Sequence, residues 1–413
     1  SKDEDYVIAR GYRLKDNKTP TAIVPPDPSA RNADSLHQGG IVLTPAGEWW
    51  GFSMQDFNSV GRLLSLAPIT WKDGWPYFGL PGNLGRNPRT WVKPKTAAPA
   101  PIAVPYARSD DFSGPALQPV WQWNHVPVDG QWSLAERPGF LRLHALPATS
   151  FWQARNSLTQ RAIGPRSSPT VTLDASGLAD GDVAGLALLN LPYATLGVEK
   201  TAAGLQVALY DQARDRTVRA PLPAGATRVM LRADCDFLTE QARFSWSTDG
   251  KTYAPIGDPF TMVFQLTTFQ GVRYALFDYN PTGKAGGHAD FDSIDVYQPN
   301  PHGLMRAIPY GRHIRLAGWK TGDAFMPGHD GAAPLAVKDM GLGRVALQSG
   351  AAWVSVDAKG GVGLRKGRPG QAQSFQWIET PTGELVLMSL ATNRFLRVDP
   401  ATHAVRADSP GPL

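Results

Sequence analysis

Residues 37–94 constrain the fold of this chain more than any other stretch. Their apolar runs are short, as in residues 41–42, 49–52 and 63–66, and Gly, Pro, Asn and Asp interrupt them. Short runs between such turn residues predict short antiparallel strands. The rest of the chain fits this interpretation, because Gly (42), Pro (36) and Trp (13) are frequent and only 19% of the residues are charged. We therefore predict an all-β protein rich in turns.

Aromatic side chains are dense in the same stretch, and polar side chains lie between them. Flat rings and a few directed polar groups are what a sugar site needs, because a pyranose has apolar faces and a rim of hydroxyls. A β core with scattered surface polar residues would give the same pattern, and the chemistry alone leaves both interpretations open. The aromatic residues are Trp49, Trp50, Phe52, Phe57, Trp71, Trp75, Tyr77, Phe78 and Trp91, and the polar ones are His37, Gln38, Gln55, Asp56 and Arg62.

Length and charge narrow the classes of protein. A chain of 413 residues predicts two to four domains, each with its own core. The net charge of +5 is small and forms no basic stripe, so we expect no nucleic-acid partner. No apolar run approaches the ~20 residues of a membrane span, so we expect no membrane partner. Cys235 is the only cysteine, which excludes an internal disulfide and a Cys-based metal cluster.

Residues 37–94 contain five unusual words in order: HQGG, T-x-x-GEWWGF, SVGR, W-K-D-GWPYFGLPGN and R-x-PRTW-x-KP. These words resemble the last part of the catalytic propeller of glycoside hydrolase family 43, whose members are β-xylosidases and α-L-arabinofuranosidases. The resemblance implies that residues 1–96 form the last blades of a five-bladed β-propeller. Leu43 departs from the family, because many relatives have an acidic residue at this position.

A partial propeller implies a missing partner. Residues 1–96 would supply roughly one and a half to two blades of four strands each, from about four to six short strands. Such a fragment leaves sheet edges and core side chains uncovered. The resemblance therefore implies that the chain is the C-terminal part of a larger or two-piece enzyme, and that its partner is an N-terminal propeller fragment.

Residues 97–107 are a Pro/Ala linker, and residues 108–299 follow as a second unit. Strand-like segments alternate with turns in this unit, and the STDG sequence of residues 247–250 predicts a hairpin. We predict a jelly-roll-like β-sandwich. Its DDFS, PVWQWNHVP and RPGFLRLHA words resemble the sandwich that follows the propeller in family 43 enzymes. One aromatic of that sandwich reaches the active-site mouth in relatives, and the candidate loop aromatics here are Phe151, Trp152, Phe277 and Tyr279.

Residues 300–413 contain an internal repeat. VALQSGAAWVSVD (345–357) aligns with LVLMSLATNRFLRVD (385–399), about forty residues further on, and a weaker copy begins near residues 313–316. A repeat of this length with strand-turn-strand character predicts a β-trefoil-like domain, and it resembles fascin-like trefoils. Recurring aromatics in such repeats favour core over a glycan site, and here they are Trp353, Phe375, Trp377 and Phe395.

Arg62 is the main candidate for substrate binding. Its SVGR word resembles that of the arginine that contacts the sugar at the cleavage subsite of family 43. A guanidinium can bind two hydroxyls and lower the pKa of a nearby carboxylate. The alternative is an arginine at the surface end of a strand. Weaker candidates for the same pocket are Gln38, Trp50, Phe52 and Asp56, of which Trp50 and Phe52 could equally belong to the blade core.

Two calcium sites are expected as structural cofactor sites. The family resemblance implies that His37 lies on the propeller axis near a central calcium, whose remaining ligands would be water because calcium prefers oxygen. The alternative is a hydrogen-bonded core histidine. In the sandwich, Asp111 (beside Asp110) and Asp292 (beside Asp290) would share a calcium if the first and last strands pair. The alternative there is a set of solvated turn aspartates.

The family inverts configuration with a general acid and a general base about 6.5–9.5 Å apart. Its carboxylates lie on early blades, in an ADP word and a G-x-E-x-P word, and neither occurs at a suitable place here. We therefore predict no catalytic carboxylate in this chain. The chain would supply the floor of the pocket, a sugar-binding arginine and the covering domain.

The predicted function is removal of terminal xylose or arabinose from xylo-oligosaccharide or arabinoxylan. A second hypothesis is a non-catalytic carbohydrate-binding assembly of sandwich and trefoil. A third is that the trefoil docks the enzyme to itself or to another protein.

Overall fold

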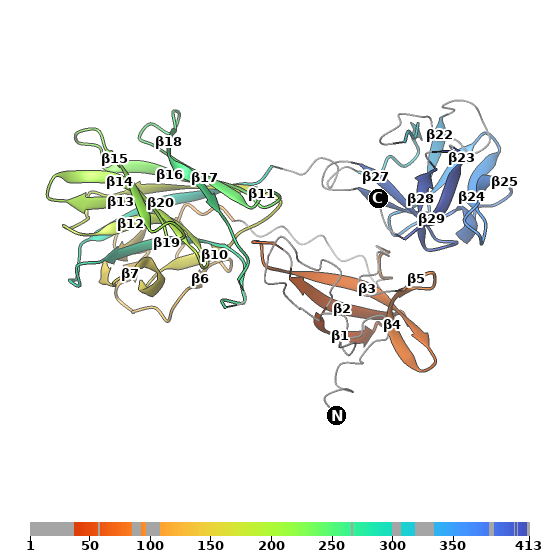
Figure 1. Cartoon of the computed structure of the whole chain (residues 1–413), viewed down its shortest axis with the longest axis horizontal. Helices are drawn as coiled ribbons and strands as arrows, with labels where there is room; N and C mark the ends of the chain where they lie inside the picture. The colour runs from red at the N-terminus through yellow and green to blue at the C-terminus, as the bar shows by residue number, and fades with distance from the viewer. Residues whose placement is uncertain are drawn as a thin grey trace.

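The computed structural model consists of strands joined by turns (Figure 1). Its described part comprises residues 37–56, 58–84, 92–95, 108–265, 267–299, 307–318, 334–379, 384–399, 401–402 and 404–410. Within this part the helical elements are two 3-10 turns, Phe151–Gln153 and Gln371–Gln373, and no helix could span a membrane. The prediction of an all-β protein is confirmed. The predicted linker, residues 97–107, lies outside the described residues.

The described part of the first unit is one antiparallel five-stranded sheet in the order β1-β2-β3-β4-β5. The strand number expected for residues 1–96 stays a prediction, because residues 1–36 lie outside the described residues. Gly51 in β2 is required on one face, because a Cβ there would lie 2.4 Å from Cε1 of Phe78. Ile69 covers the same face. The strands are β1 His37–Leu43, β2 Trp49–Asp56, β3 Arg62–Lys72, β4 Trp75–Leu80 and β5 Asn83–Leu84.

The opposite face of this sheet carries exposed apolar side chains. Phe52 pairs with Leu66 and Met54 with Leu64 across β2 and β3, so these side chains share one face. Phe52 is 50% exposed, Leu66 55% and Leu64 81%, and none of the described residues covers them. We call Val42, Phe52, Leu64 and Leu66 the open face. Contiguous apolar surface of this kind marks an interaction site.

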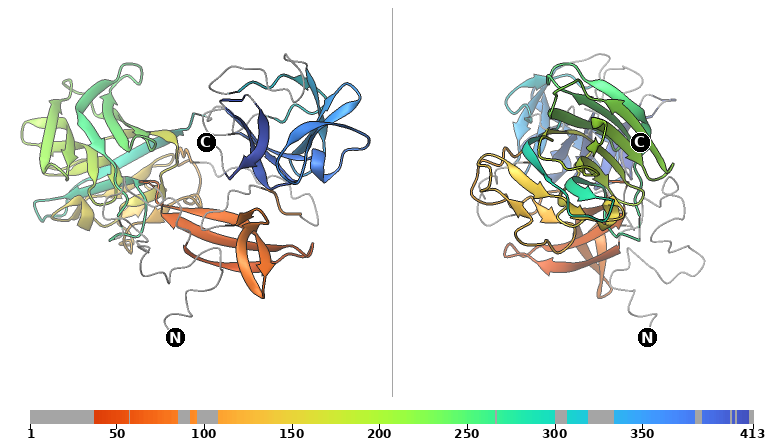
Figure 2. Two further views of the ribbon diagram at one scale, coloured as in Figure 1. Left: turned by 45° about the vertical axis from the view of Figure 1, so that its right-hand side comes forward. Right: turned by 90° about the vertical axis from the view of Figure 1, so that its left-hand side faces the viewer.

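The second unit is a β-sandwich of two sheets that pack face to face (Figures 1 and 2). One sheet has the order β15-β14-β13-β12-β19-β10-β6 with β9 beside β19, and the other has the order β18-β17-β16-β11-β20-β8-β7. Fully buried side chains of both sheets, such as Leu186, Leu196, Leu231 and Phe291, form one core. Along β16 alternate residues are buried, as the two-residue period of a strand requires. Strands β12 and β19 are buried on both faces, because a second cluster that includes Phe151 and Tyr193 packs on their outer side.

The strands of the first sheet of the sandwich are β6 Gln122–Trp123, β9 Leu146–Pro147, β10 Leu158–Arg161, β12 Val183–Leu189, β13 Ala194–Thr201, β14 Gly204–Asp211, β15 Arg216–Pro221 and β19 Arg273–Asn280. Those of the second are β7 Trp132–Ser133, β8 Leu141–His144, β11 Arg166–Asp174, β16 Arg228–Asp236, β17 Gln241–Ser247, β18 Ala254–Thr261 and β20 His288–Tyr297. The hairpin predicted at residues 247–250 joins β17 to β18. The two ends of the unit lie side by side, because Asp110 bridges to Ile294.

The C-terminal unit is a nine-stranded sheet, and its repeat is confirmed at the level of hairpins. β23 pairs with β24 through Gln348 and Trp353, and β27 pairs with β28 in the same way through Met388 and Phe395. The described strands do not close into a barrel, so the trefoil stays a prediction. The strands are β21 His313–Ile314, β22 Leu335–Asp339, β23 Arg344–Ser349, β24 Ala352–Val356, β25 Val362–Lys366, β26 Phe375–Glu379, β27 Leu385–Ser389, β28 Arg394–Val398 and β29 Val405–Ser409.

The repeated aromatics of this unit are mainly core residues, as expected. Phe375 is fully buried, Phe395 is 1% exposed and Trp353 is 8% exposed. Trp377 packs partly buried against the same cluster. The indole of Trp353 also donates to the carbonyl oxygen of Gly367, so its polar atom is satisfied.

Asp278 on β19 is a carboxyl that is almost completely buried in the sandwich. Both of its side-chain oxygens lack a hydrogen-bond partner among the described residues. Burial, and then the charge of Asp182, raises its pKa well above the usual range. Because the folded pKa exceeds the unfolded one of about 3.9, its contribution to stability is full below that pH and is lost as pH rises through the folded pKa.

We expect Asp278→Asn to stabilise the protein relative to the wild type increasingly between pH 4 and pH 8. The difference should grow by up to about 1.4 kcal/mol per pH unit below the folded pKa. Denaturant unfolding at several pH values measures it. The control Asp111→Asn should destabilise the protein by an amount that stays constant between pH 4 and pH 8. Hydrogen bonds from Ser113 lower the pKa of Asp111, so the contribution of its carboxylate is lost only below the unfolded pKa of about 3.9. A pH-independent difference for Asp278→Asn would contradict the prediction.

Candidate functional site

Arg62 lies where the first sheet meets the sandwich. It begins β3, opposite Asp56 at the end of β2. Its guanidinium carbon lies 5.0 Å from the ring centroid of Phe269, which belongs to the loop between β18 and β19 of the sandwich. Phe269 is 63% exposed and has φ of 51°, a conformation rare for a bulky residue. The pair brings a cation and an accessible aromatic face together at the surface of the junction.

Asn190 holds the loop that carries Phe269. It follows the last residue of β12 and is 1% exposed. Its amide nitrogen donates to the carbonyl oxygens of Val263 at 3.0 Å and Gln270 at 3.2 Å. Its amide oxygen accepts from the hydroxyl of Thr268 at 2.7 Å. The side-chain amide of Asn190 thus forms hydrogen bonds to residues on both sides of Phe269. These bonds hold the loop and explain how Phe269 keeps its strained backbone conformation.

The turn between β2 and β3 is attached to the sandwich by its backbone. The backbone N–H of Ser59 donates to both carboxylate oxygens of Glu240 at 3.1 Å. The N–H of Val272 donates to the carbonyl oxygen of Ser59 at 2.7 Å, and the amide of Asn58 donates to the carbonyl oxygen of Phe237. Arg62 follows this turn directly, so these bonds fix its position relative to Phe269.

Two glycines allow this close approach. A Cβ on Gly271 would lie 1.9 Å from the carbonyl oxygen of Val60, and one on Gly61 would lie 2.6 Å from the nitrogen of Gly271. Both clashes involve backbone atoms, which no rotamer change can relieve. Gly61 also has φ of 102°, which favours glycine.

We expect Gly271→Ala to weaken the docking of the first sheet on the sandwich by about 1–3 kcal/mol, as overpacking does elsewhere. The readout is the denaturant midpoint followed by tryptophan fluorescence, since the first sheet is rich in Trp. Gly363→Ala is a matched control, because a Cβ there meets nothing within 4 Å. An equal, small effect of both changes would show that the contact is not tight.

The other predicted sugar-binding residues do not all gather around Arg62. Trp50 is 4% exposed, and its indole donates to Glu48 at 3.3 Å. It pairs with Pro68, six residues along β3 from Arg62, or about 20 Å at the rise of a strand. Phe52 belongs to the open face. His37, Gln38 and Asp56 lie on β1 and β2, and their side chains lie outside the described structure.

Phe269 was not among the aromatics that the sequence singled out in the sandwich. Phe151 and Phe277 are buried together with Tyr193, and they therefore do not reach the junction. The available sequence signal was the TTFQG segment at 267–271, where an aromatic is followed by a turn glycine. That signal is weak without the contact to Arg62.

The carboxylates expected to bind calcium in the sandwich are engaged by other side chains. Asp292 pairs with Arg228, and Asp290 accepts from Arg142 and from Arg137 at 2.7–2.8 Å. Asp111 accepts from its neighbour Ser113. No group of three or more His, Cys, Asp or Glu in the described part could hold a metal ion. Guanidinium partners are not the oxygen shell that calcium requires, so Asp290 and Asp292 in this arrangement do not fit the ion, and the sandwich calcium stays a prediction.

Comparison with known proteins gives a specific match for the sandwich. The family described as the β-xylosidase C-terminal concanavalin A-like domain matches residues 109–297. A β-xylosidase of Formosa agariphila is 31% identical over 285 residues, which cover 62% of this chain and 47% of that protein. A putative β-xylosidase of Xylanibacter ruminicola is also 31% identical, over 55% of this chain and 42% of its own length.

Solved structures agree with these relatives. A bifunctional family 43 protein of Bacteroides eggerthii is 36% identical with a TM-score of 0.56, over 64% of this chain and 34% of that chain. A family 43 enzyme engineered for endo-xylanase and exo-arabinofuranosidase activity is 28% identical with a TM-score of 0.55, over 64% of this chain and 54% of that chain.

These similarities identify the sandwich as a domain of carbohydrate-active enzymes. Residues 109–297 match the β-xylosidase C-terminal concanavalin A-like domain of glycoside hydrolase family 43. The chain spans about half the length of the curated relatives it matches.

Proposed function

We propose that this protein, joined to a preceding catalytic part, is a glycoside hydrolase that removes terminal xylose or arabinose from xylan-derived chains. The observation that carries the proposal is the junction of Arg62 with Phe269, on a sandwich that matches a family 43 domain. The relatives are named as β-xylosidases, and one engineered relative acts on arabinofuranosides.

The two side chains have complementary parts in sugar binding. The guanidinium of Arg62 can donate two parallel hydrogen bonds to neighbouring hydroxyls of the terminal sugar. The exposed ring of Phe269 offers an apolar surface to the sugar face and keeps water away from the guanidinium. Asn190 acts through Phe269, because it positions the loop and does not itself face the junction.

The reaction itself needs carboxylates that we place on the preceding part. One would activate water as general base, and a second would protonate the leaving oxygen, with inversion at the anomeric carbon. Arg62 would hold the sugar between them. Gln38 and Asp56, at the same end of the first sheet as Arg62, would complete the floor of this pocket.

The open face supports the existence of that preceding part. Its exposed apolar side chains would pack against an earlier blade, and the first sheet would then be a late blade of a five-bladed propeller. Calcium near His37 on the propeller axis belongs to the same proposal. The C-terminal repeats would close into a trefoil.

Proton NMR of the complete protein, with the proposed propeller part, tests this function on xylo-oligosaccharides and arabinoxylan. We expect xylose or arabinose to appear first as the inverted anomer, and to equilibrate later. First appearance of the retained anomer would contradict the mechanism. Binding of xylo-oligosaccharides without any release of sugar would favour the non-catalytic binding assembly instead.

A further inference from the structure

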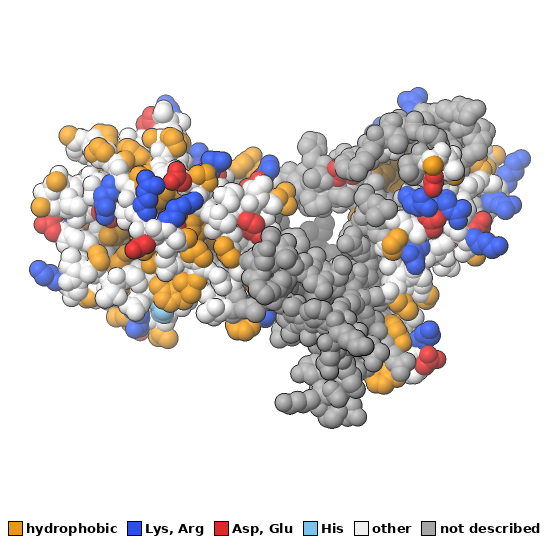
Figure 3. Space-filling model, in the orientation of Figure 1, with side chains coloured by type: hydrophobic (Ala, Val, Ile, Leu, Met, Phe, Trp, Pro, Cys, Tyr) orange, Lys and Arg blue, Asp and Glu red, His pale blue; other side chains and the backbone are white. Residues whose placement is uncertain are grey.

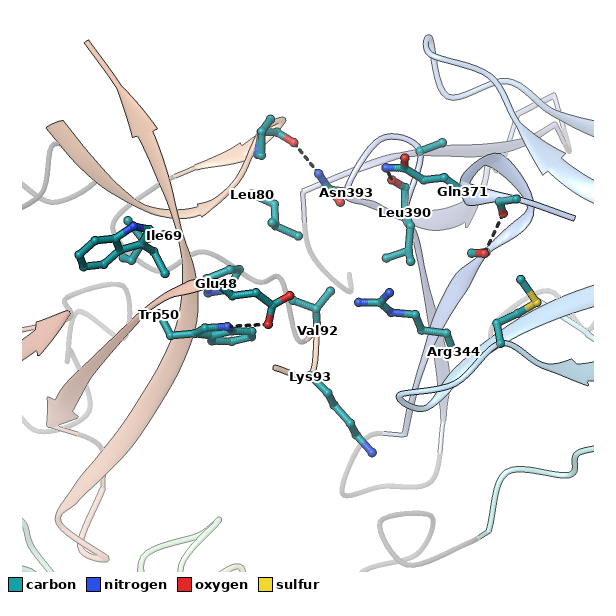
Figure 4. Close-up of a pocket in the computed structure, with 17 residues that line it drawn as sticks. Glu48, Trp50, Ile69, Leu80, Val92, Lys93, Arg344, Gln371, Leu390 and Asn393 are labelled. Carbon is teal, nitrogen blue, oxygen red and sulfur yellow. Dashed lines mark hydrogen bonds between the residues drawn. The ribbon is translucent and has the colours of Figure 1, made fainter. Parts of the chain in front are cut away.

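A cavity of about 890 Å³ lies between the first sheet and the C-terminal sheet (Figure 4). It is remote from Arg62, because Trp50 and Pro68 form its wall on the first sheet. Arg344, Gln371 and Asn393 line it from the C-terminal sheet. The space falls within the range of small-molecule sites, about 300–1,000 Å³. The family match at 109–297 does not include it, and of the predicted sugar-binding residues only Trp50 lines it.

The two walls are held together by specific contacts. The side-chain amide of Asn83 donates to the backbone carbonyl oxygen of Asn393 at 3.1 Å. The side-chain amide of Asn393 donates in turn to the backbone carbonyl oxygen of Pro81 at 2.9 Å. Leu80 and Val92 of the first unit pack against the buried cluster of Met388, Leu390 and Phe395. The cavity is therefore a formed site between attached units, with part of its lining fixed by hydrogen bonds.

The cavity has more positive than negative charge. Arg344 extends into it from β23 in Figure 4, and its Nε is buried without a hydrogen-bond partner among the described residues. Lys93 brings a second cation to the same wall, because a Cβ on Gly343 would lie 3.1 Å from Lys93 Nζ. The carboxylate of Glu48 lies across from them, and one of its oxygens already accepts from Trp50 and from the N–H of Lys95. Arg344 thus faces one partly engaged carboxylate, and Lys93 adds a second positive charge beside Gly343.

We propose that this cavity binds a sugar acid, a mono- or disaccharide that carries a carboxylate. The ligand carboxylate would accept from Arg344, whose planar fork matches its two oxygens, with Lys93 as a second cation. The amide nitrogens of Gln371 and Asn393 donate to the carbonyl oxygens of Leu390 and Pro81, and their amide oxygens can accept from ligand hydroxyls. The apolar wall of Pro68, Ile69, Leu80 and Val92 suits the carbon face of the ring. Nε of Arg344 is buried from solvent, so the ligand carboxylate would accept from the terminal nitrogens of the guanidinium, which Figure 4 shows pointing into the cavity.

Isothermal titration of the 413-residue chain with D-glucuronate and with D-glucose tests the proposal. The two sugars have the same ring and differ at C6, so the comparison isolates the carboxylate. We expect glucuronate to bind at least about tenfold more tightly, since hydrogen bonds to charged groups are the stronger ones. Equal affinities, no binding of glucuronate, or tighter binding of glucose 6-phosphate would overturn the assignment.

Two variants should shift the glucuronate affinity in opposite directions, which misfolding could not do. Arg344→Gln should weaken binding by about tenfold to hundredfold. Glu48→Gln should tighten it several-fold, because the opposing charge is removed while an acceptor for Trp50 is kept. Arg365→Gln, at an exposed position of β25 outside the cavity, is the matched control and should change nothing. Weaker binding by both Arg344→Gln and Glu48→Gln would contradict the charge argument. The test does not depend on glycosidase activity.

Discussion

Arg62→Ala should lower kcat/KM of the complete protein toward xylosides or arabinosides by about 10²-fold. The change removes one or two charged hydrogen bonds to the sugar, each about 1.5–3 kcal/mol, and leaves Phe269 in place. Arg62→Lys should recover only a small part, because an ammonium keeps the charge but lacks the two-pronged geometry. Initial rates on aryl glycosides measure the effect.

Arg232→Ala is the matched control for Arg62→Ala. Arg232 also stacks on an aromatic ring, with its guanidinium carbon 3.6 Å from the ring centroid of Tyr253, but on the sandwich. It should leave kcat/KM unchanged within about twofold. If both arginine variants lost activity equally, loss of a stacked arginine in general, and not sugar contact at Arg62, would explain the result.

Leu64→Asp should have a small effect on stability in the 413-residue chain and a large one in the complete protein. In the 413-residue chain Leu64 is 81% exposed, so the change should alter stability by no more than about 0.5 kcal/mol. In the complete protein the open face would be covered, and a buried unpaired carboxylate costs several kcal/mol, or about 3–5 kcal/mol when a buried charge loses its partner. Thermal unfolding and retained activity of both forms measure the difference.

Val126→Asp controls for surface charge. Val126 is 78% exposed on a loop of the sandwich, so this change should be mild in both forms. An equally mild effect of Leu64→Asp in the complete protein would mean that no earlier blade covers the open face. The partial propeller would then be the wrong description of residues 37–84.

Local patterns in the sequence were enough to predict strands and hairpins. The short apolar runs at residues 184–189 and 273–280 predict strands of the sandwich, and the STDG turn predicts the connection of β17 to β18. The repeat at 345–357 and 385–399 predicts two equivalent hairpins. In each case the signal lies within a few residues of the structure it specifies.

The junctions between units depend on contacts that no local pattern records. Asn190 binds the backbone 73 and 80 residues away, and Asn83 binds the backbone 310 residues away. The residues around Phe269 in the sequence give only a weak signal, and the contact with Arg62 in the folded chain is what marks Phe269 as a candidate site residue. The charged cavity likewise forms only when Glu48 of the first sheet and Arg344 of the C-terminal sheet come together in the folded chain. The family resemblance was enough to select Arg62 from the sequence, but its partner Phe269 could be found only from the packing of distant segments in the structure.

Sugar release by the chain with and without its proposed catalytic part tests the central claim most directly. 4-Nitrophenyl β-D-xyloside and α-L-arabinofuranoside would be offered to the 413-residue chain alone and to the complete protein. We expect nitrophenol from the complete protein and none from the chain alone. Release by the chain alone would contradict the assignment of the catalytic carboxylates to the preceding part. No release by a folded complete protein would contradict the glycoside hydrolase function itself.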